Sequence, residues 1–256
     1  MRASDMADFA GRTALITGGA SGIGAEVARW LDARGIAELV LVDVDAGGLE
    51  ALELTCQVRR YVGDVGDPAL WDEVEAGLNR LDHALINAGV ANGGPLADFD
   101  FAEWRRIMAI NLDGAFLGLR TALRAMKRSG GKSVVLTSSV VGSKATANTG
   151  AYGVSKAGVG HLAKIAAAEH LADGIRVNAV APGRVDTPIW TKTDHFRALE
   201  GELGREAALR SLGKQVGGDH VFTSAAEIAG QIGFLLSDDC ANITGQVLVS
   251  DGGYSL

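Results

Sequence analysis

Residues 13–24 of the chain read Thr13-Ala-Leu-Ile-Thr-Gly-Gly-Ala-Ser-Gly-Ile-Gly24, an apolar run that leads directly into a glycine-rich segment. The run 13–17 predicts a buried strand, and residues 25–31 have helical character. Glycines at a strand-to-helix turn let the backbone turn sharply and approach a pyrophosphate, whose charge the helix N-terminus stabilises. We therefore predict a dinucleotide-binding turn. Its predicted contacts are Gly18, Ser21, Gly22, Ile23 and Gly24.

Six further apolar, β-branched runs alternate with helical stretches along the chain. With the first run, the predicted strands cover residues 13–17, 39–42, 60–62, 84–86, 133–137, 176–180 and 246–249. Because these runs are almost continuously hydrophobic, we expect strands buried on both faces, as in a parallel sheet covered by helices. The predicted fold class is α/β: a doubly wound, Rossmann-type, mostly parallel seven-stranded sheet with helices on both faces.

The chain of 256 residues is 47% hydrophobic and contains no repeat or proline-rich linker. We therefore predict a single domain over residues 1–256, with residues 1–11 as an N-terminal extension in which Met6 is an alternative start. Residues from about 188 to 223 break the strand–helix rhythm, and we interpret them as an inserted, helical lid. The scattered apolar residues of this lid are Trp190, Phe196, Leu199, Leu203 and Leu212. Trp190 and Phe196 either line a substrate pocket or anchor the lid to the core.

Composition excludes several classes of partner. The net charge of −7, from 24 Lys and Arg against 31 Asp and Glu, leaves no global positive field to attract nucleic acid or anionic lipid. Cys56 and Cys240 form no CxxC and lie near no clustered histidines, so we predict no metal site. The first ten residues lack the apolar core of a signal peptide, and no stretch reaches the ~18 apolar residues of a membrane helix. We expect a cytoplasmic protein with no nucleic-acid or membrane partner.

Asp43 follows the second predicted strand, nineteen positions after Gly24. A carboxylate at this place can accept hydrogen bonds from the ribose hydroxyls of a dinucleotide. It would also repel the 2′-phosphate of NADP, and neither Ser21 nor Val44 supplies the cation that this phosphate needs. We therefore predict NAD as the cofactor. Alternatively, Asp43 caps the turn after the strand, and the two roles are compatible.

Tyr152 and Lys156 stand four residues apart at the start of a helical segment, so they share one helix face. An ammonium group beside a phenol favours the phenolate, so we expect the pKa of Tyr152 to fall below its usual value of ~10, which suits a general acid–base. Ser138 and Ser139 follow the strand at 133–137, at the edge where parallel sheets place ligand sites, and a hydroxyl there can polarise a substrate oxygen. Asn111 lies in an apolar helical stretch and must find hydrogen bonds if it is buried.

Taken together, these motifs resemble the short-chain dehydrogenase/reductase family in its compact form, from Thr13 to near the C-terminus. The matching segments are residues 17–24, Asp64-Val65, Asn87-Ala88-Gly89, Asn111, Ser139, residues 152–156, and Pro182-Gly183 followed by Thr187. One departure is Ile86, which stands where the family usually has the first of two asparagines.

The resemblance implies a set of roles. Tyr152 exchanges the proton, Lys156 also binds the nicotinamide ribose, and Asn111 supports a proton relay. Ser139 holds the carbonyl oxygen, because the family's serine normally lies thirteen residues before its tyrosine. The further cofactor contacts that the resemblance implies are Asp64, Val65, Asn87, Ala88, Gly89, Pro182, Gly183, Val185 and Thr187.

The expected reaction is hydride transfer between NAD(H) and a small-molecule secondary alcohol or ketone. One rival is a 3-oxoacyl-thioester reductase, which resembles the same family but normally prefers NADPH, so Asp43 counts against it. Another is a non-catalytic, NAD-binding regulatory protein, against which the intact Ser139, Tyr152 and Lys156 count. By analogy with the family we also expect a homo-oligomer, with a tetramer favoured over a dimer. The small residues that would let helices approach across its interface are Ala157, Gly158, Gly160, Ala163 and Ala167.

Overall fold

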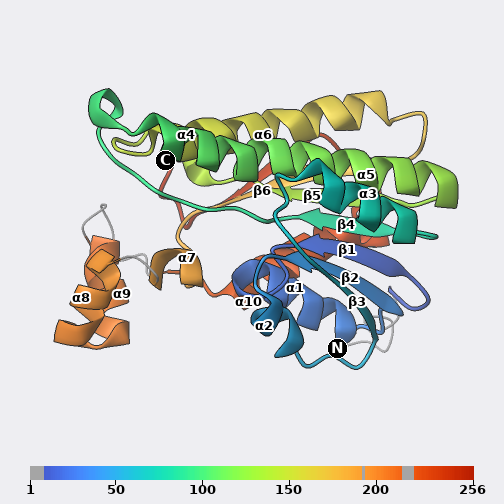
Figure 1. Cartoon of the computed structure of the whole chain (residues 1–256), viewed down its shortest axis with the longest axis horizontal. Coiled ribbons are helices and arrows are strands. Elements are labelled where there is room, and N and C mark those ends of the chain that lie inside the picture. Colours follow the sequence, from blue (N-terminus) through green and yellow to red (C-terminus); the bar gives the residue numbers. More distant parts are fainter. Residues whose placement is uncertain (1–8, 192–193, 215–221) are drawn as a thin grey trace.

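Seven parallel strands form one sheet in the computed structural model, in the order β3-β2-β1-β4-β5-β6-β7 (Figure 1). The structure describes residues 9–191, 194–214 and 222–256. The strands are β1 (Thr13–Thr17), β2 (Glu38–Asp43), β3 (Gln57–Val62), β4 (His83–Ile86), β5 (Ser133–Thr137), β6 (Arg176–Pro182) and β7 (Val247–Ser250). Every predicted strand is present, and the predicted fold class is confirmed. β3 begins at Gln57 rather than at residue 60.

Helices cover both faces of the sheet. They are α1 (Gly22–Asp32), α2 (Ala46–Glu50), α3 (Pro68–Gly77), α4 (Phe101–Met108), α5 (Gly114–Ser129), α6 (Gly150–Glu169), α7 (Pro188–Thr191), α8 (Asp194–Leu203), α9 (Arg205–Lys214) and α10 (Ala225–Leu236). Short turns are η2 (Leu96–Asp98), η4 (Val140–Gly142) and η5 (Asp238–Cys240), and the π-helical turn η3 (Ala109–Asp113) joins α4 to α5.

Successive strand residues pack into two separate cores. In β1, Leu15 lies in the cluster beneath α3, α5 and α6, and Ile16 lies in the cluster that includes α1, α2 and α10. Both side chains are fully buried. This alternation explains why the strands are hydrophobic at almost every position. β1 lies between β2 and β4, so the order of the strands reverses at β1. Open α/β sheets leave a crevice at such a point, outside the carboxyl ends of the strands.

The N-terminal region joins the core earlier than predicted. Residues 1–8 of the expected extension, including Met6, lie outside the described residues. Phe9 is 1% exposed and its ring meets those of Trp30 and His83 edge-on, at centroid distances of 5.6 and 5.2 Å. The packed domain therefore includes Phe9.

The predicted lid contains α7, α8 and α9, and α8 and α9 stand to one side of the sheet (Figure 1). Phe196 is fully buried in a small cluster with Ala208, Leu209 and Phe222, and Trp190 packs edge-on against Phe222 at 5.5 Å. Phe196 and Trp190 thus belong to a small apolar core within the lid. This packing fits the predicted anchoring role better than the lining of a substrate pocket. The side chain of Leu212 lies outside the described residues.

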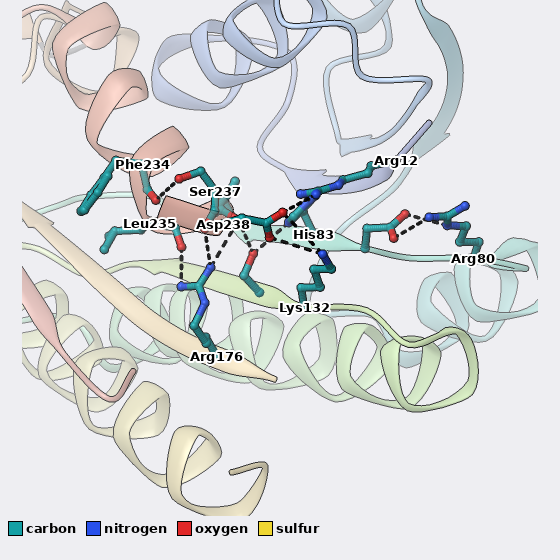
Figure 2. Close-up of polar contacts among 12 residues, drawn as sticks. Arg12, Arg80, His83, Lys132, Arg176, Phe234, Leu235, Ser237 and Asp238 are labelled. Atoms are coloured by element: carbon teal, nitrogen blue, oxygen red, sulfur yellow. Dashed lines mark hydrogen bonds and ion pairs between the residues drawn. The ribbon is translucent and has the colours of Figure 1, made fainter. Parts of the chain in front are cut away.

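A polar network, buried at His83 and Ser133 and exposed at Asp238 and Lys132, connects the amino ends of the strands to the end of α10 (Figure 2). Asp238 pairs with Arg12 at 2.5 Å and with Lys132 at 3.4 Å. The His83 ring contacts the Ser133 hydroxyl through Nδ1 at 2.8 Å and the Arg12 guanidinium through Nε2 at 3.3 Å. Because Arg12 can only donate, Nε2 of His83 accepts and its proton lies on Nδ1. Burial, with Arg12 nearby, lowers the pKa of His83 to about 3.

The neutral state of His83 predicts a pH dependence of stability. An unfolded chain takes up this proton near pH 6.5, whereas the folded chain takes it up only near pH 3. The free energy of unfolding should therefore fall by about 1.4 kcal/mol per pH unit from this group as the pH drops through that window. In urea unfolding, the free energy of unfolding of His83→Gln should depend less steeply on pH than that of wild type. The difference in slope should correspond to about one proton. The control is His161→Gln, because His161 is exposed. Equal slopes for wild type and His83→Gln would contradict the prediction.

No described helix is long and apolar enough to cross a membrane. Within the described ranges, no three His, Cys, Asp or Glu side chains gather in a way that could hold a metal ion.

Candidate active site

The glycine turn after β1 has a backbone that only glycine suits. Gly18 and Gly22 have φ angles of 67° and 54°, in the left-handed region. A side chain at Gly24 would collide with the carbonyl of Gly18, and one at Gly22 would lie 3.3 Å from Thr187. Ser21 is the N-cap of α1, and its side chain makes no capping hydrogen bond. The first N–H groups of a helix have no acceptor within it, so this turn forms a cradle that fits a pyrophosphate.

Asp43, at the end of β2, braces the same turn. Its Oδ2 accepts from the Ala20 N–H and its Oδ1 accepts from the Asp45 N–H, each at 3.0 Å. The capping role that the sequence leaves open is therefore present. Each carboxylate oxygen can accept one further hydrogen bond, so the capping leaves Asp43 able to bind a ribose.

Asn87 ties together the carboxyl ends of β1, β4 and β5. Its N–H donates to the Thr17 hydroxyl at 2.8 Å, as does the Ala88 N–H at 3.0 Å. Its Oδ1 accepts from the Thr137 hydroxyl at 3.1 Å. Sequence reasoning missed Thr17 and Thr137, although both are polar residues that end a buried strand. The preceding Ile86 is buried in the core cluster, so the departure from the family pattern is accommodated by apolar packing.

Two of the predicted cofactor contacts, Asp64 and Val65, differ in their exposure to solvent. Asp64 is exposed, and its Oδ1 accepts from the Gly66 N–H at 2.8 Å. Val65 is buried, and its carbonyl accepts from the Trp71 indole at 2.7 Å. Asp64 therefore lies at the protein surface, and Val65 lies in the core.

Asn111 lies in η3, where the chain takes a π-helical turn of the kind that often accompanies functional sites. Its side chain is 1% exposed and is fully hydrogen-bonded. Oδ1 accepts from the Val90 N–H at 2.8 Å, and Nδ2 donates to the Val90 carbonyl at 2.9 Å and to the Ser155 hydroxyl at 3.0 Å. Asn111 thus anchors the backbone after β4 to α6.

Lys156 points into the crevice from α6. Its Nζ donates to the Thr137 carbonyl at 2.8 Å and lies 5.8 Å from the centroid of the Tyr152 ring. A side chain at Gly89 would lie 3.2 Å from both Lys156 Nζ and Asn111 Oδ1, so this glycine admits the lysine. Burial lowers the pKa of Lys156 to about 8.

Ser139 is the serine that faces Tyr152. The hydroxyl of Ser138 donates to the Lys156 carbonyl at 2.7 Å and is used within the fold. Burial raises the pKa of Tyr152, and a hydrogen bond with Ser139 partly offsets this effect. The prediction that Lys156 lowers the pKa of Tyr152 is wrong for the protein without its cofactor. Lys156 donates to a backbone carbonyl, and the Tyr152 phenol is desolvated.

The end of β6 brings the remaining predicted contacts to the glycine turn. Pro182 pairs with Ser250 of β7, and Gly183 has no room for a side chain because Asp251 lies against it. Val185 and Thr187 are both buried, and the Thr187 hydroxyl donates to the Val185 carbonyl at 3.3 Å. Thr187 adjoins Gly22 and therefore lies at the mouth of the cradle.

Comparison with known proteins agrees with this geometry. A family model described as enoyl-(acyl carrier protein) reductase matches residues 18–255. Cis-4-hydroxycyclohexanecarboxylate dehydrogenase of Sinomonas cyclohexanicum is 38% identical over 264 residues, covering 96% of this chain and 98% of the relative. The chain belongs to the short-chain dehydrogenase/reductase family.

Solved structures of this family superpose closely on the chain. The crystal structure of levodione reductase has a TM-score of 0.87 at 36% identity and covers 96% of this chain and 98% of its own. L-sorbose reductase from Gluconobacter frateurii, complexed with NADPH and L-sorbose, has a TM-score of 0.89 at 26% identity, with 98% of each chain covered. Family membership makes the chain an oxidoreductase that uses a nicotinamide cofactor.

Two loops contact each other just before α6, and sequence reasoning did not foresee their contact. Gly94 pairs with Thr149, and the Gly94 N–H donates to the Asn148 carbonyl at 3.0 Å. Asn148 has a φ of 63°, which is uncommon for a residue with a side chain. The contact therefore lies at the N-terminus of the helix that carries Tyr152.

Proposed function

We propose that the protein transfers a hydride between NAD(H) and a secondary alcohol or ketone. The observation that carries this proposal is the cluster of Ser139, half-buried Tyr152 and buried Lys156, which the hydrogen bonds of Thr137 and Asn87 connect to the glycine turn. A buried lysine is costly to a fold, so its burial beside a phenol favours a role in the chemistry of a site.

The proposed roles follow from the surroundings of each side chain. Bound nicotinamide supplies the carbon that accepts or donates the hydride. Tyr152 Oη holds the proton that leaves the substrate hydroxyl in oxidation and returns it in reduction. Ser139 donates a hydrogen bond to the same substrate oxygen and so positions it against the phenol. The positive charge of Lys156 stabilises the phenolate once the proton has moved, and Asn111 keeps the lysine's neighbouring backbone in place.

A ring-bearing secondary alcohol is the proposed substrate class. The relative named for a hydroxycyclohexanecarboxylate aligns over almost the whole chain, and its name supports a ring-bearing alcohol. We propose NAD rather than NADP because Asp43 lies beside the glycine turn. A structural neighbour holds NADPH, so the choice of NAD rests on this side chain.

We further propose that the chain forms a homo-oligomer through the outer faces of α5 and α6. A groove between these helices is lined by Phe116, Leu119, Leu123, Leu162 and Ile165. Phe116 and Ile165 are nearly half exposed. Of the small residues expected at the interface only Ala157 is exposed, and Gly158 faces Leu112 of its own chain instead. That expectation was wrong because the small face of α6 packs within the subunit. Light scattering of the purified protein measures the oligomeric state.

The function is tested by following the absorbance of reduced cofactor with NAD and NADP in parallel. The panel contains cyclohexanols, acyclic secondary alcohols and sugar alcohols, with 3-oxoacyl thioesters assayed in the reductive direction. We expect NAD-dependent oxidation of the cyclic alcohols. Faster reduction of the thioesters would favour the 3-oxoacyl-thioester reductase. NADH binding without turnover of any compound would favour the regulatory protein.

A further inference from the structure

The C-terminal tail, residues 251–256, folds into a compact turn that is built by Asp251. Its carboxylate accepts from the Gly253 N–H at 2.9 Å and from the Ser255 N–H at 2.8 Å. The Tyr254 N–H donates to the Asp251 carbonyl at 3.2 Å. These hydrogen bonds hold Tyr254 in a defined, half-buried position.

Tyr254 lies between two cationic side chains from different loops. Lys144 Nζ donates to the Tyr254 carbonyl at 2.5 Å and lies over the Tyr254 ring at 4.1 Å from its centroid. The guanidinium carbon of Arg184 lies 5.7 Å from the same centroid. A cation over an aromatic face contributes about 0.5–1 kcal/mol at exposed sites and more where it is desolvated. One aromatic ring therefore links two loops that share no strand.

Both loops carry residues of the candidate active site. Lys144 comes five residues after Ser139, in the loop whose end contacts Gly94, and Arg184 comes three residues before Thr187. The tail is also fixed to the second loop by its backbone, because the Gly183 N–H donates to the Ser250 carbonyl at 2.9 Å. The clasp formed by Lys144, Tyr254 and Arg184 thus joins the segment after β5 to the segment after β6.

We propose that Tyr254 is a positioning residue that holds the Ser139 loop and the Thr187 segment in register, and thereby shapes the pocket for the substrate. This inference rests on the proposed function, since the two loops flank its reacting groups. A misplacement of about 1 Å at such a site can reduce the rate by about a hundredfold. Tyr254 acts without touching the reacting atoms, so its loss should raise the substrate KM through the Ser139 loop and weaken NADH binding through the Thr187 segment.

The test compares Tyr254→Ala, which removes the ring, with Tyr254→Phe, which keeps it; both variants keep the backbone carbonyl that Lys144 contacts. Leu256→Ala is the matched control, because Leu256 is fully exposed in the same tail. We expect Tyr254→Ala to raise the KM for the alcohol by about tenfold and also to raise the NADH dissociation constant. Tyr254→Phe and Leu256→Ala should keep wild-type values. A KM that stays unchanged, while activity falls only with the folded fraction, would overturn the proposal.

Hydrogen–deuterium exchange tests the clasp independently of turnover. In Tyr254→Ala, the amides of residues 140–149 and 183–187 should exchange faster than in wild type, while those of β1 and α1 keep their protection. Leu256→Ala should leave both loops unchanged. If wild type oxidises no alcohol, the proposed function fails, but faster exchange in these two loops would still support the clasp. Unchanged exchange in Tyr254→Ala would overturn it.

Discussion

Tyr152→Phe is expected to lower kcat by about a thousandfold and to leave NADH binding nearly unchanged. General acid–base groups typically contribute about 10²–10⁴-fold to a rate. The substitution removes one hydroxyl, which is hydrogen-bonded to Ser139, and it keeps the half-buried ring. Steady-state rates and fluorescence titration with NADH measure the two effects separately.

Tyr61→Phe is the matched control, because it removes a phenol hydroxyl from the edge strand β3. It should change kcat and NADH binding by less than about twofold, as surface substitutions away from a site usually do. If Tyr152→Phe retained wild-type turnover, the proton would be held by another group. If it lost NADH binding to the same extent as turnover, the tyrosine would serve the cofactor rather than the substrate.

Asp43→Asn is expected to reverse or abolish the preference for NAD. The substitution removes a charge that repels a 2′-phosphate and weakens the charge-assisted bonds to the ribose, which are worth about 1.5–3 kcal/mol each. The ratio of kcat/KM for NAD over that for NADP should therefore fall by about 10- to 100-fold. The loss of NAD affinity should exceed any gain for NADP, because the substitution supplies no cation for the phosphate.

Asp45→Asn is the control for Asp43→Asn. Asp45 loses the same charge two residues away, where its side chain caps α2 by accepting from the Gly48 N–H at 3.0 Å. Asparagine caps a helix about as well as aspartate, so the fold is unaffected. The ratio of kcat/KM for NAD over that for NADP should change by less than about threefold, because water and salt screen an exposed charge. An equal shift in both variants would mean that the preference reflects overall charge and not a contact with the ribose.

The strands and the glycine turn could be predicted because they depend on short-range patterns. A strand that is buried on both faces must be hydrophobic throughout, and β1 shows this most clearly. The start of β3 could not be predicted in this way, because Gln57 and Arg59 are polar residues of an edge strand, where polar groups find partners. Arg59 pairs with Glu38 at 2.6 Å, and Arg60 donates to the Leu49 carbonyl at 2.9 Å.

Tyr152, Lys156, Ser139 and Asn111 could be found from their spacing, but their interactions could not. The choice between Ser138 and Ser139 depended on the family pattern, and the structure gives Ser138 a different partner. The pKa of Tyr152 depends on desolvation and on where Lys156 points, and both are set by residues far away in the chain.

The clasp around Tyr254 was not predicted for a related reason. It joins the last residues of the chain to a loop more than a hundred positions earlier, between Lys144 and Tyr254. Local composition at either place, a lysine in a polar loop and a tyrosine near a terminus, has no distinctive pattern. Only the strand order, which places β6 between β5 and β7, brings the two segments together.

The most direct measurement uses a cyclohexanol that carries deuterium on its carbinol carbon, incubated with NAD and the purified protein. The mass of the reduced cofactor is then recorded. We predict NADH that is one mass unit heavier than with the unlabelled alcohol, together with the corresponding ketone, and neither product with Tyr152→Phe. Reduced cofactor that lacks deuterium, or ketone formed without reduced cofactor, would contradict direct hydride transfer from the alcohol to NAD.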